Sequence, residues 1–173
     1  MHTLRRVATV LIWPGLALGT ACDRLDSPTA VVQFGVGTGV NPGKVTGGGQ
    51  INVLVNDVAG TGTFGFNARR EGTDGPVSGH INYINHVTGV HLNCEVESGG
   101  IISAPGEEPG TASFGGYECS PNSTFSNFIF TVVDNGEPGR NDTFTIQYDT
   151  DDGTVIDGVG PIRSGNIQIH KNQ

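Results

Sequence analysis

Residues 79–97 read GHINYINHVTGVHLNCEVE, and this stretch decides the fold class. Apolar and polar side chains alternate on both sides of residues 86–89, HVTG, which is typical of two strands joined by a turn. With HVTG as the loop, the stretch predicts an antiparallel hairpin with a defined register. The predicted cross-strand pairs are Asn85 with Val90, Tyr83 with Leu92, Ile81 with Cys94, and His80 with Glu95.

The two faces of this predicted hairpin differ in chemistry. Because side chains alternate along a strand, one face buries apolar residues and the other meets solvent. The residues expected to be buried are Ile81, Tyr83, Leu92 and Val96. The opposite face is expected to expose His80, Asn82, His91, Asn93 and Glu95.

The same period of two continues across the chain, and turn residues separate the runs. Other runs contain Ile51, Val53 and Val55; Phe64 and Phe66; Phe128, Phe130 and Val132; Phe144, Ile146 and Tyr148; and Ile167 and Ile169, with a weaker run at 113–119. Short connections favour pairing of successive strands. We predict an all-β domain over residues 43–173, a single antiparallel meander of about eight strands in a closed or nearly closed barrel. A β-sandwich is the alternative, since alternation does not distinguish the two.

Four segments resemble a group of small exported bacterial domains known as post-COAP domains. The segments are KVTGGGQI at 44–51, GHINY at 79–83, DNGEPG at 134–139 followed by DTF at 142–144, and GNIQIH at 165–170. The resemblance implies an extracytoplasmic β-domain, found alone or appended to larger secreted proteins. It implies no activity and no catalytic residue.

The N-terminal segment has the layout of a secretory signal peptide over residues 1–21. Arg5 and Arg6 precede an apolar run from residue 7 to residue 21, which is shorter than the roughly 20 residues a membrane span needs. Cleavage there leaves Cys22 first, and a lipoprotein would carry its lipid on that sulfur. A lipobox usually has leucine where Gly19 stands, so release by ordinary signal peptidase is the alternative. Residues 22–42 read as a lipidated N-terminus and flexible tether.

The predicted signal peptide indicates export. The protein would then be held at a bacterial cell envelope by the lipid anchor or be secreted. All seventeen acidic residues follow residue 21 but only seven of the nine basic ones do, so the mature chain has a formal net charge of −10. We therefore exclude nucleic acid as a partner and expect membrane contact through the anchor only. Three cysteines leave an odd thiol unless one is lipidated, and Cys94 and Cys119 are then predicted to form a disulfide.

Two sets of side chains are candidate metal sites. His80 and Glu95, opposite one another in the predicted hairpin, could share a metal ion with His91. The alternative is a solvated polar face with a weak His–Glu pair. Calcium, the one cofactor considered, takes oxygen ligands from acidic loops. The candidate calcium ligands are Asp134, Glu137 and Asp142 in one loop, and Asp149, Asp151, Asp152 and Asp157 in another. Turn formation by Asp side chains is the alternative explanation.

These observations predict a non-catalytic binding or structural role for an exported, lipid-anchored domain. Its ligand would be an unidentified envelope or extracellular molecule. A calcium-stabilised adhesion or polymer-binding module is the alternative, and a hydrolase is a further one, although no nucleophile elbow occurs in the sequence.

Overall fold

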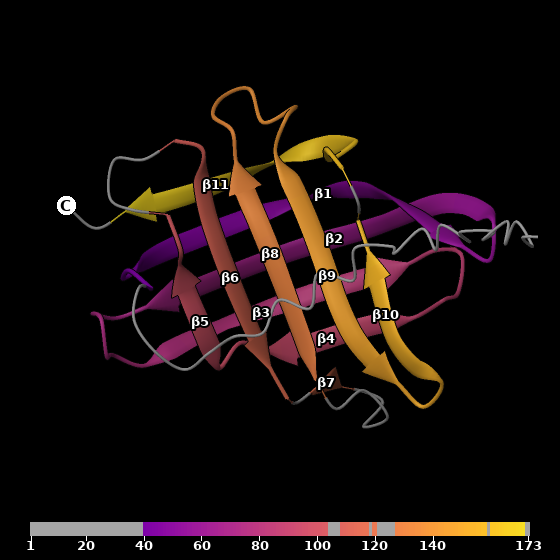
Figure 1. Ribbon diagram of the computed structural model, residues 1–173, viewed down its shortest axis with the longest axis horizontal. Helices are drawn as coiled ribbons and strands as arrows, with labels where there is room; N and C mark the ends of the chain where they lie inside the picture. The colour runs from indigo at the N-terminus through magenta and orange to yellow at the C-terminus, as the bar shows by residue number, and fades with distance from the viewer. Residues whose placement is uncertain (1–39, 104–107, 118, 121–126, 159, 172–173) are drawn as a thin grey trace, which may run out of the picture. The chain divides into compact units, whose positions relative to one another are not determined.

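The computed structural model describes residues 40–103, 108–117, 119–120, 127–158 and 160–171. These residues belong to one compact unit and form eleven strands in two antiparallel sheets (Figure 1). The described part of the chain contains no helix, and so none that could span a membrane. The all-β prediction is confirmed. The predicted signal peptide, Cys22 and the tether up to residue 39 lie outside the described residues.

The first sheet has six strands, in the order β11-β1-β2-β3-β4-β7. They are β11 (Ser164–Lys171), β1 (Gly43–Val55), β2 (Val58–Arg70), β3 (Val77–Asn85), β4 (His91–Glu95) and β7 (Cys119–Ser120). Strands β1 to β4 form a meander, but the predicted single meander of about eight strands is wrong, because β11 pairs with β1 and five strands form a second sheet. The turn between β1 and β2 is Asn56-Asp57, and both residues have positive φ, at 48° and 65°, as a tight hairpin turn requires.

The second sheet has five strands, in the order β10-β9-β8-β6-β5. They are β10 (Gly153–Asp157), β9 (Thr143–Thr150), β8 (Phe128–Asp134), β6 (Gly110–Gly116) and β5 (Ser98–Ile101). The predicted run at 113–119 is divided between the two sheets, because β6 lies in this sheet and β7 in the other. Strands β5 and β10 were not predicted, since both are short and Ser98–Ile101 contains a single large apolar residue.

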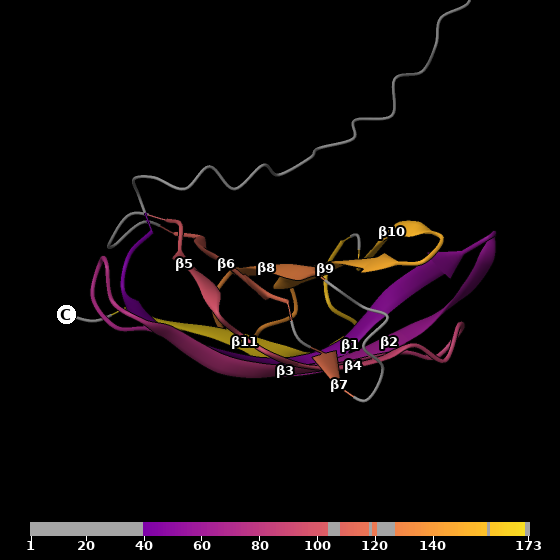
Figure 2. The same cartoon turned by 90° about the horizontal axis from the view of Figure 1, so that it is seen from below.

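The two sheets lie face to face, and their strands cross at a steep angle (Figures 1 and 2). Aromatic side chains fill the space between them. The rings of Phe64 and Phe144 stack with centroids 4.0 Å apart, and those of Phe66 and Phe130 are 4.9 Å apart. Such rings combine a large buried apolar area with favourable ring contacts. Since the sheets pack through side chains and the described strands do not close into a ring, the barrel prediction is wrong and the sandwich alternative is compatible.

The β3–β4 hairpin has the predicted register. Ile81 pairs with Cys94, Tyr83 with Leu92, and His80 with Glu95. The apolar partners are at most 1% exposed, whereas His80, His91 and Glu95 face solvent. The predicted disulfide is also present. Cys94 on β4 and Cys119 on β7 are cross-strand partners with Cα atoms 4.1 Å apart, and their sulfur atoms are bonded.

Candidate functional site

The outward side chains of β1 to β4 form three neighbouring cross-strand rows, which we call the polar face. It lies on the side of the six-stranded sheet that turns away from the other sheet (Figure 2). In order from β1 to β4, the rows are Thr46, Asn67, His80 and Glu95; Gly48, Gly65, Asn82 and Asn93; and Gln50, Thr63, Ile84 and His91. These rows carry one formal charge, that of Glu95. Amides, hydroxyls and imidazoles provide the rest of the hydrogen-bonding groups.

Several polar-face side chains bond to one another. The His80 ring nitrogen Nε2 bonds to Oδ1 of Asn93, and Asn82 Nδ2 lies 3.1 Å from Nε2 of His91. The Thr63 hydroxyl lies 2.8 Å from Nε2 of His86 in the β3–β4 loop. These pairs link neighbouring strands and orient the rings and amides across the sheet. The imidazoles are therefore engaged with neutral partners.

The candidate metal set is only partly brought together. His80 and Glu95 are cross-strand partners, but His91 pairs with Ile84, four residues along β4 from Glu95. At about 3.4 Å per residue, that separation is about 14 Å. Among the residues that the structure describes, no three His, Cys, Asp or Glu side chains are grouped so that they could hold a metal ion. The hydrogen bonds of His80 and His91 go to the amides of Asn93 and Asn82, and metal binding by these residues stays a prediction.

Two glycines form an open floor in the middle of the polar face. Gly48 and Gly65 are cross-strand partners, and neither has φ in the left-handed region. A Cβ built on Gly65 would have no heavy atom within 4 Å, and one on Gly48 would have its nearest neighbour, the Phe64 carbonyl oxygen, at 3.5 Å. Neither the backbone conformation nor the packing therefore requires glycine here. Glycine in a strand costs about 0.5–1 kcal/mol relative to alanine.

A buried carboxylate lies between the sheets on the other side of β3. Asp157 at the end of β10 is 2% exposed, and its Oδ2 accepts hydrogen bonds from three side chains. The donors are the Tyr83 hydroxyl at 2.7 Å, the Asn85 amide at 2.9 Å and the Tyr148 hydroxyl at 3.1 Å. Gly62 on β2 leaves room for this cluster, because a Cβ there would lie 2.9 Å from the Tyr83 ring and hydroxyl.

The environment of this cluster holds both tyrosines in the protonated form. Burial, followed by the hydrogen bond to Asp157, raises the pKa of Tyr83 far above its ordinary value. Burial and then the negative charge of Asp157 raise the pKa of Tyr148 in the same way. The two hydroxyls thus remain donors, and the cluster joins the sheets rather than exchanging protons with solvent.

The first acidic loop covers the edge of β11. Asp142 is fully buried, and its two oxygens accept the backbone N–H groups of Asn135 and Ile167, each at 2.9 Å. Asp134 accepts the N–H of Ile169, also at 2.9 Å. An edge strand presents unpaired N–H groups that can recruit another strand. The carboxylates predicted as calcium ligands therefore satisfy the edge of the sheet.

Glu137 completes this loop from the solvent side. Its Oε1 accepts hydrogen bonds from the Asn166 amide at 2.8 Å and from the Gln168 amide at 3.1 Å. These two bonds, in that order, lower the pKa of Glu137. The carboxylate is thus kept charged and bound to β11.

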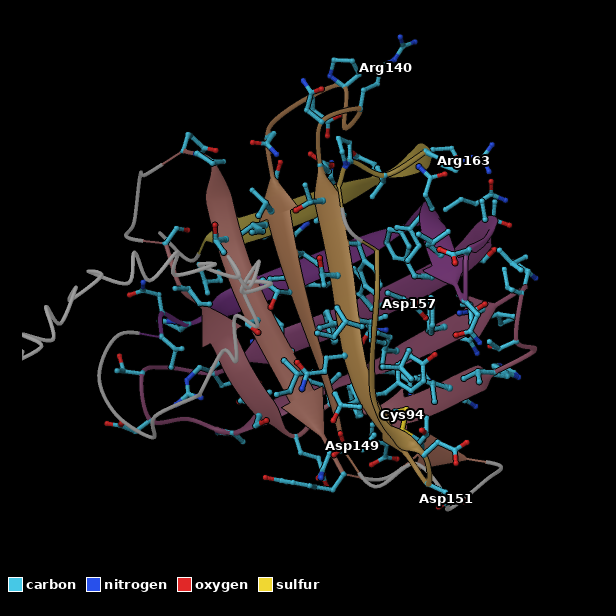
Figure 3. All side chains as sticks on the ribbon, turned by 45° about the vertical axis from the view of Figure 1, so that its right-hand side comes forward. Cys94, Arg140, Asp149, Asp151, Asp157 and Arg163 are labelled. Atoms are coloured by element: carbon cyan, nitrogen blue, oxygen red, sulfur yellow. A yellow bond between two sulfur atoms is a disulfide. The ribbon has the colours of Figure 1, made fainter. Side chains whose placement is uncertain are left out.

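The second acidic loop does not gather its four aspartates. Asp157 lies between the sheets, away from Asp149 and Asp151 at the end of the β9–β10 hairpin (Figure 3). Asp149 accepts hydrogen bonds from Asn127 and from the Thr154 hydroxyl, at 3.0 and 2.8 Å. Asp151 and Asp152 are exposed in the turn. The geometry favours turn and strand-end roles for these residues, and calcium binding stays a prediction.

The sequence did not identify the buried roles of Asp142 and Asp157. Asp142 follows a glycine-rich turn and Asp157 precedes one. Aspartates in such turns ordinarily face solvent. A signal existed only for Asp157, because Thr154-Val155-Ile156-Asp157 is a short β-branched run that ends in the acid. No family model, no curated protein and no solved structure matches this chain. The resemblance to post-COAP domains therefore stays a prediction.

Proposed function

We propose that the protein is an exported, lipid-anchored envelope domain that acts by binding, without catalysis, and that the polar face is its binding surface. One observation carries the proposal. Three cross-strand rows on one face of the sheet are made mostly of neutral hydrogen-bonding side chains in register, with one charged residue among them. Such groups recognise an extended polar molecule by many weak contacts.

The packing of the strands beneath the polar face favours a binding role. Phe64, Phe66 and Ala68 of β2 and Ile81 and Tyr83 of β3 enter a core that contains stacked aromatic rings. The disulfide ties β4 to β7. A surface held rigidly in this way loses little conformational entropy when a ligand binds. Interactions inside the domain thus preorganise the amides and rings of the polar face.

The contacts of the histidines favour binding over hydrolysis. A hydrolytic histidine needs a carboxylate that orients its ring and a nucleophile beside it. His86 contacts the Thr63 hydroxyl, but no hydrogen bond joins His86 to a carboxylate among the described residues. His80 and His91 contact amides.

Co-sedimentation with insoluble cell-envelope material tests the proposal. We expect the purified protein to bind, and the pair of substitutions Asn82→Ala and His91→Ala to weaken binding by about tenfold, because two hydrogen-bonding side chains are lost. The matched control is Asn127→Ala with Asp149→Ala, an exposed hydrogen-bonded pair on the other sheet. Absence of binding, or equal binding by both double variants, would contradict the proposal.

A further inference from the structure

The glycine floor marks where a ligand approaches the polar face most closely. Gly48 and Gly65 lie side by side on β1 and β2 with space above them for side chains. The fold does not need glycine at either position. Neither conformation nor packing therefore explains why two residues that lower stability relative to alanine stand here. A strand glycine that no described residue covers is a site where another molecule can contact the backbone.

The groups around the floor have a definite chemistry. Thr46 and Asn67 stand on one side of it, and Gln50 and Thr63 on the other. Thr46 and Gln50 are four residues apart along β1, so these two rows are about 14 Å apart. Asn82 and Asn93 continue the glycine row onto β3 and β4. The floor is therefore a shallow strip that crosses the strands, and amide and hydroxyl side chains stand on three sides of it.

Amides and hydroxyls of this kind match a ligand rich in hydroxyl groups. Each side-chain amide offers two donors and an acceptor oxygen with two lone pairs, and a threonine hydroxyl both donates and accepts. A sugar hydroxyl also both donates and accepts, so either orientation of its proton finds a partner. The bonds of Asn82 and Asn93 to imidazoles use one group of each amide and leave the others for a ligand.

The charges of the domain select against ionic ligands. The polar face has Glu95 as the one formal charge in its three rows, and the cations Lys44 and Arg69 are cross-strand partners in the next row, beyond Thr46 and Asn67. The whole chain has a formal net charge of −8. A polymer of phosphates or carboxylates would be repelled and would find no cation beside the floor.

We propose that the polar face binds a neutral polysaccharide, whose sugar rings lie over Gly48 and Gly65 and extend along the row toward Asn82 and Asn93. The inference rests on the proposed function and names its ligand class. In this arrangement the hydroxyl groups of the polysaccharide lie against the flanking threonine and amide side chains of the protein. The missing side chains of the two glycines allow a ring to lie flat on the strand backbones.

A substitution that fills the space above the two glycines tests this inference. Gly65→Thr adds a β-branched side chain whose Cβ would have no heavy atom of the described residues within 4 Å, so we expect the variant to be folded and no less stable than wild type. We expect it to bind soluble neutral glucan oligosaccharides at least about tenfold more weakly in calorimetric titration. The matched control is Ala59→Thr, outward on the same strand and about 20 Å away, which should leave binding unchanged.

Competition separates the inference from the proposed function. Neutral glucan and chitin oligosaccharides should displace the protein from envelope material, whereas polygalacturonate, an acidic polymer, should not. Envelope binding that resists every neutral oligosaccharide, or that survives in Gly65→Thr, would overturn the inference while the binding function stood. Loss of binding in the Ala59→Thr control would also overturn it. Failure to bind envelope material at all would overturn both.

Discussion

The Asp157 carboxylate accepts a 2.7 Å hydrogen bond from the Tyr83 hydroxyl, and this bond joins β10 of one sheet to β3 of the other. Asn85 and Tyr148 donate to the same oxygen. The buried charge is thus compensated by three neutral donors. Among the described residues the one ion pair is Arg69 with Glu71, at 3.5 Å on the surface. The hydrogen bonds from Tyr83 and Asn85 to Asp157 therefore connect the two layers at this point.

Removing this carboxylate should destabilise the whole domain. In Asp157→Ala two hydroxyls and an amide lose a buried acceptor, and we expect the free energy of unfolding to fall by about 3 kcal/mol. Urea denaturation measures the change. Asp152→Ala is the control, since Asp152 is exposed, and should stay within about 0.5 kcal/mol of wild type. Equal midpoints for the two variants would contradict the role of Asp157.

The two buried tyrosines predict a loss of stability at alkaline pH. Because their pKa values are raised in the folded protein, the unfolded chain releases protons near the ordinary value of 10.0 while the folded chain keeps them. Stability is thus complete below about pH 10 and falls above it, by about 1.4 kcal/mol per pH unit for each tyrosine. Urea denaturation between about pH 9 and about pH 11 measures this slope.

A substitution assigns that slope to the cluster. Tyr148→Phe should remove about half of the alkaline slope, while Tyr83 and Asn85 still donate to Asp157. Tyr117→Phe is the control, because the Tyr117 side chain is 66% exposed. If both variants have the wild-type slope, the tyrosines do not control alkaline stability.

The disulfide should be detectable and stabilising. Mass spectrometry of the unreduced mature protein should show two hydrogens fewer than the dithiol form. Cys94 and Cys119 are 25 residues apart, and opening a loop of this length by replacing both with alanine should cost about 3 kcal/mol. Unchanged stability after reduction would show that the bond does not constrain the unfolded chain.

Calcium removal should leave the domain intact. The oxygens of Asp134, Asp142 and Glu137 already accept N–H groups, so we expect EDTA and added calcium to leave the melting temperature unchanged. Differential scanning calorimetry is the measurement. A rise of several degrees in the melting temperature with calcium would show that these carboxylates bind the ion.

Asp142→Ala, by contrast, should lower the melting temperature with or without calcium, because two backbone N–H groups lose their acceptor.

The proposed anchor depends on Cys22. We expect Cys22→Ala to move the protein from the detergent-extractable membrane fraction to the soluble fraction, or to leave it as unprocessed precursor. Wild-type protein should incorporate labelled palmitate. Wild-type protein that is soluble, unlabelled and begins at residue 22 would show that ordinary signal peptidase releases the domain.

The local features of this protein could be predicted from the sequence because each depends on neighbours in the chain. The period of two and the turn at HVTG fixed which residues of β3 and β4 face each other, and so placed His80 opposite Glu95 and exposed His91. Cysteine parity identified the disulfide between Cys94 and Cys119. The polar character of the outer hairpin face followed from the same alternation.

The tertiary structure alone decided the rest. Alternation shows which side of a strand is buried but not against which sheet, so Phe64 and Phe144 carry the same signal whether they line one barrel or face each other in two layers. The adjacency of β1 and β11, and with it the edge that Asp142 covers, depends on contacts between distant parts of the chain. An aspartate in a turn is ordinarily solvated, and Asp157 is buried only because packing brings two tyrosine hydroxyls and an amide from other strands to its oxygen. Hydrogen-bond partners that come from distant strands leave no periodic trace in the sequence.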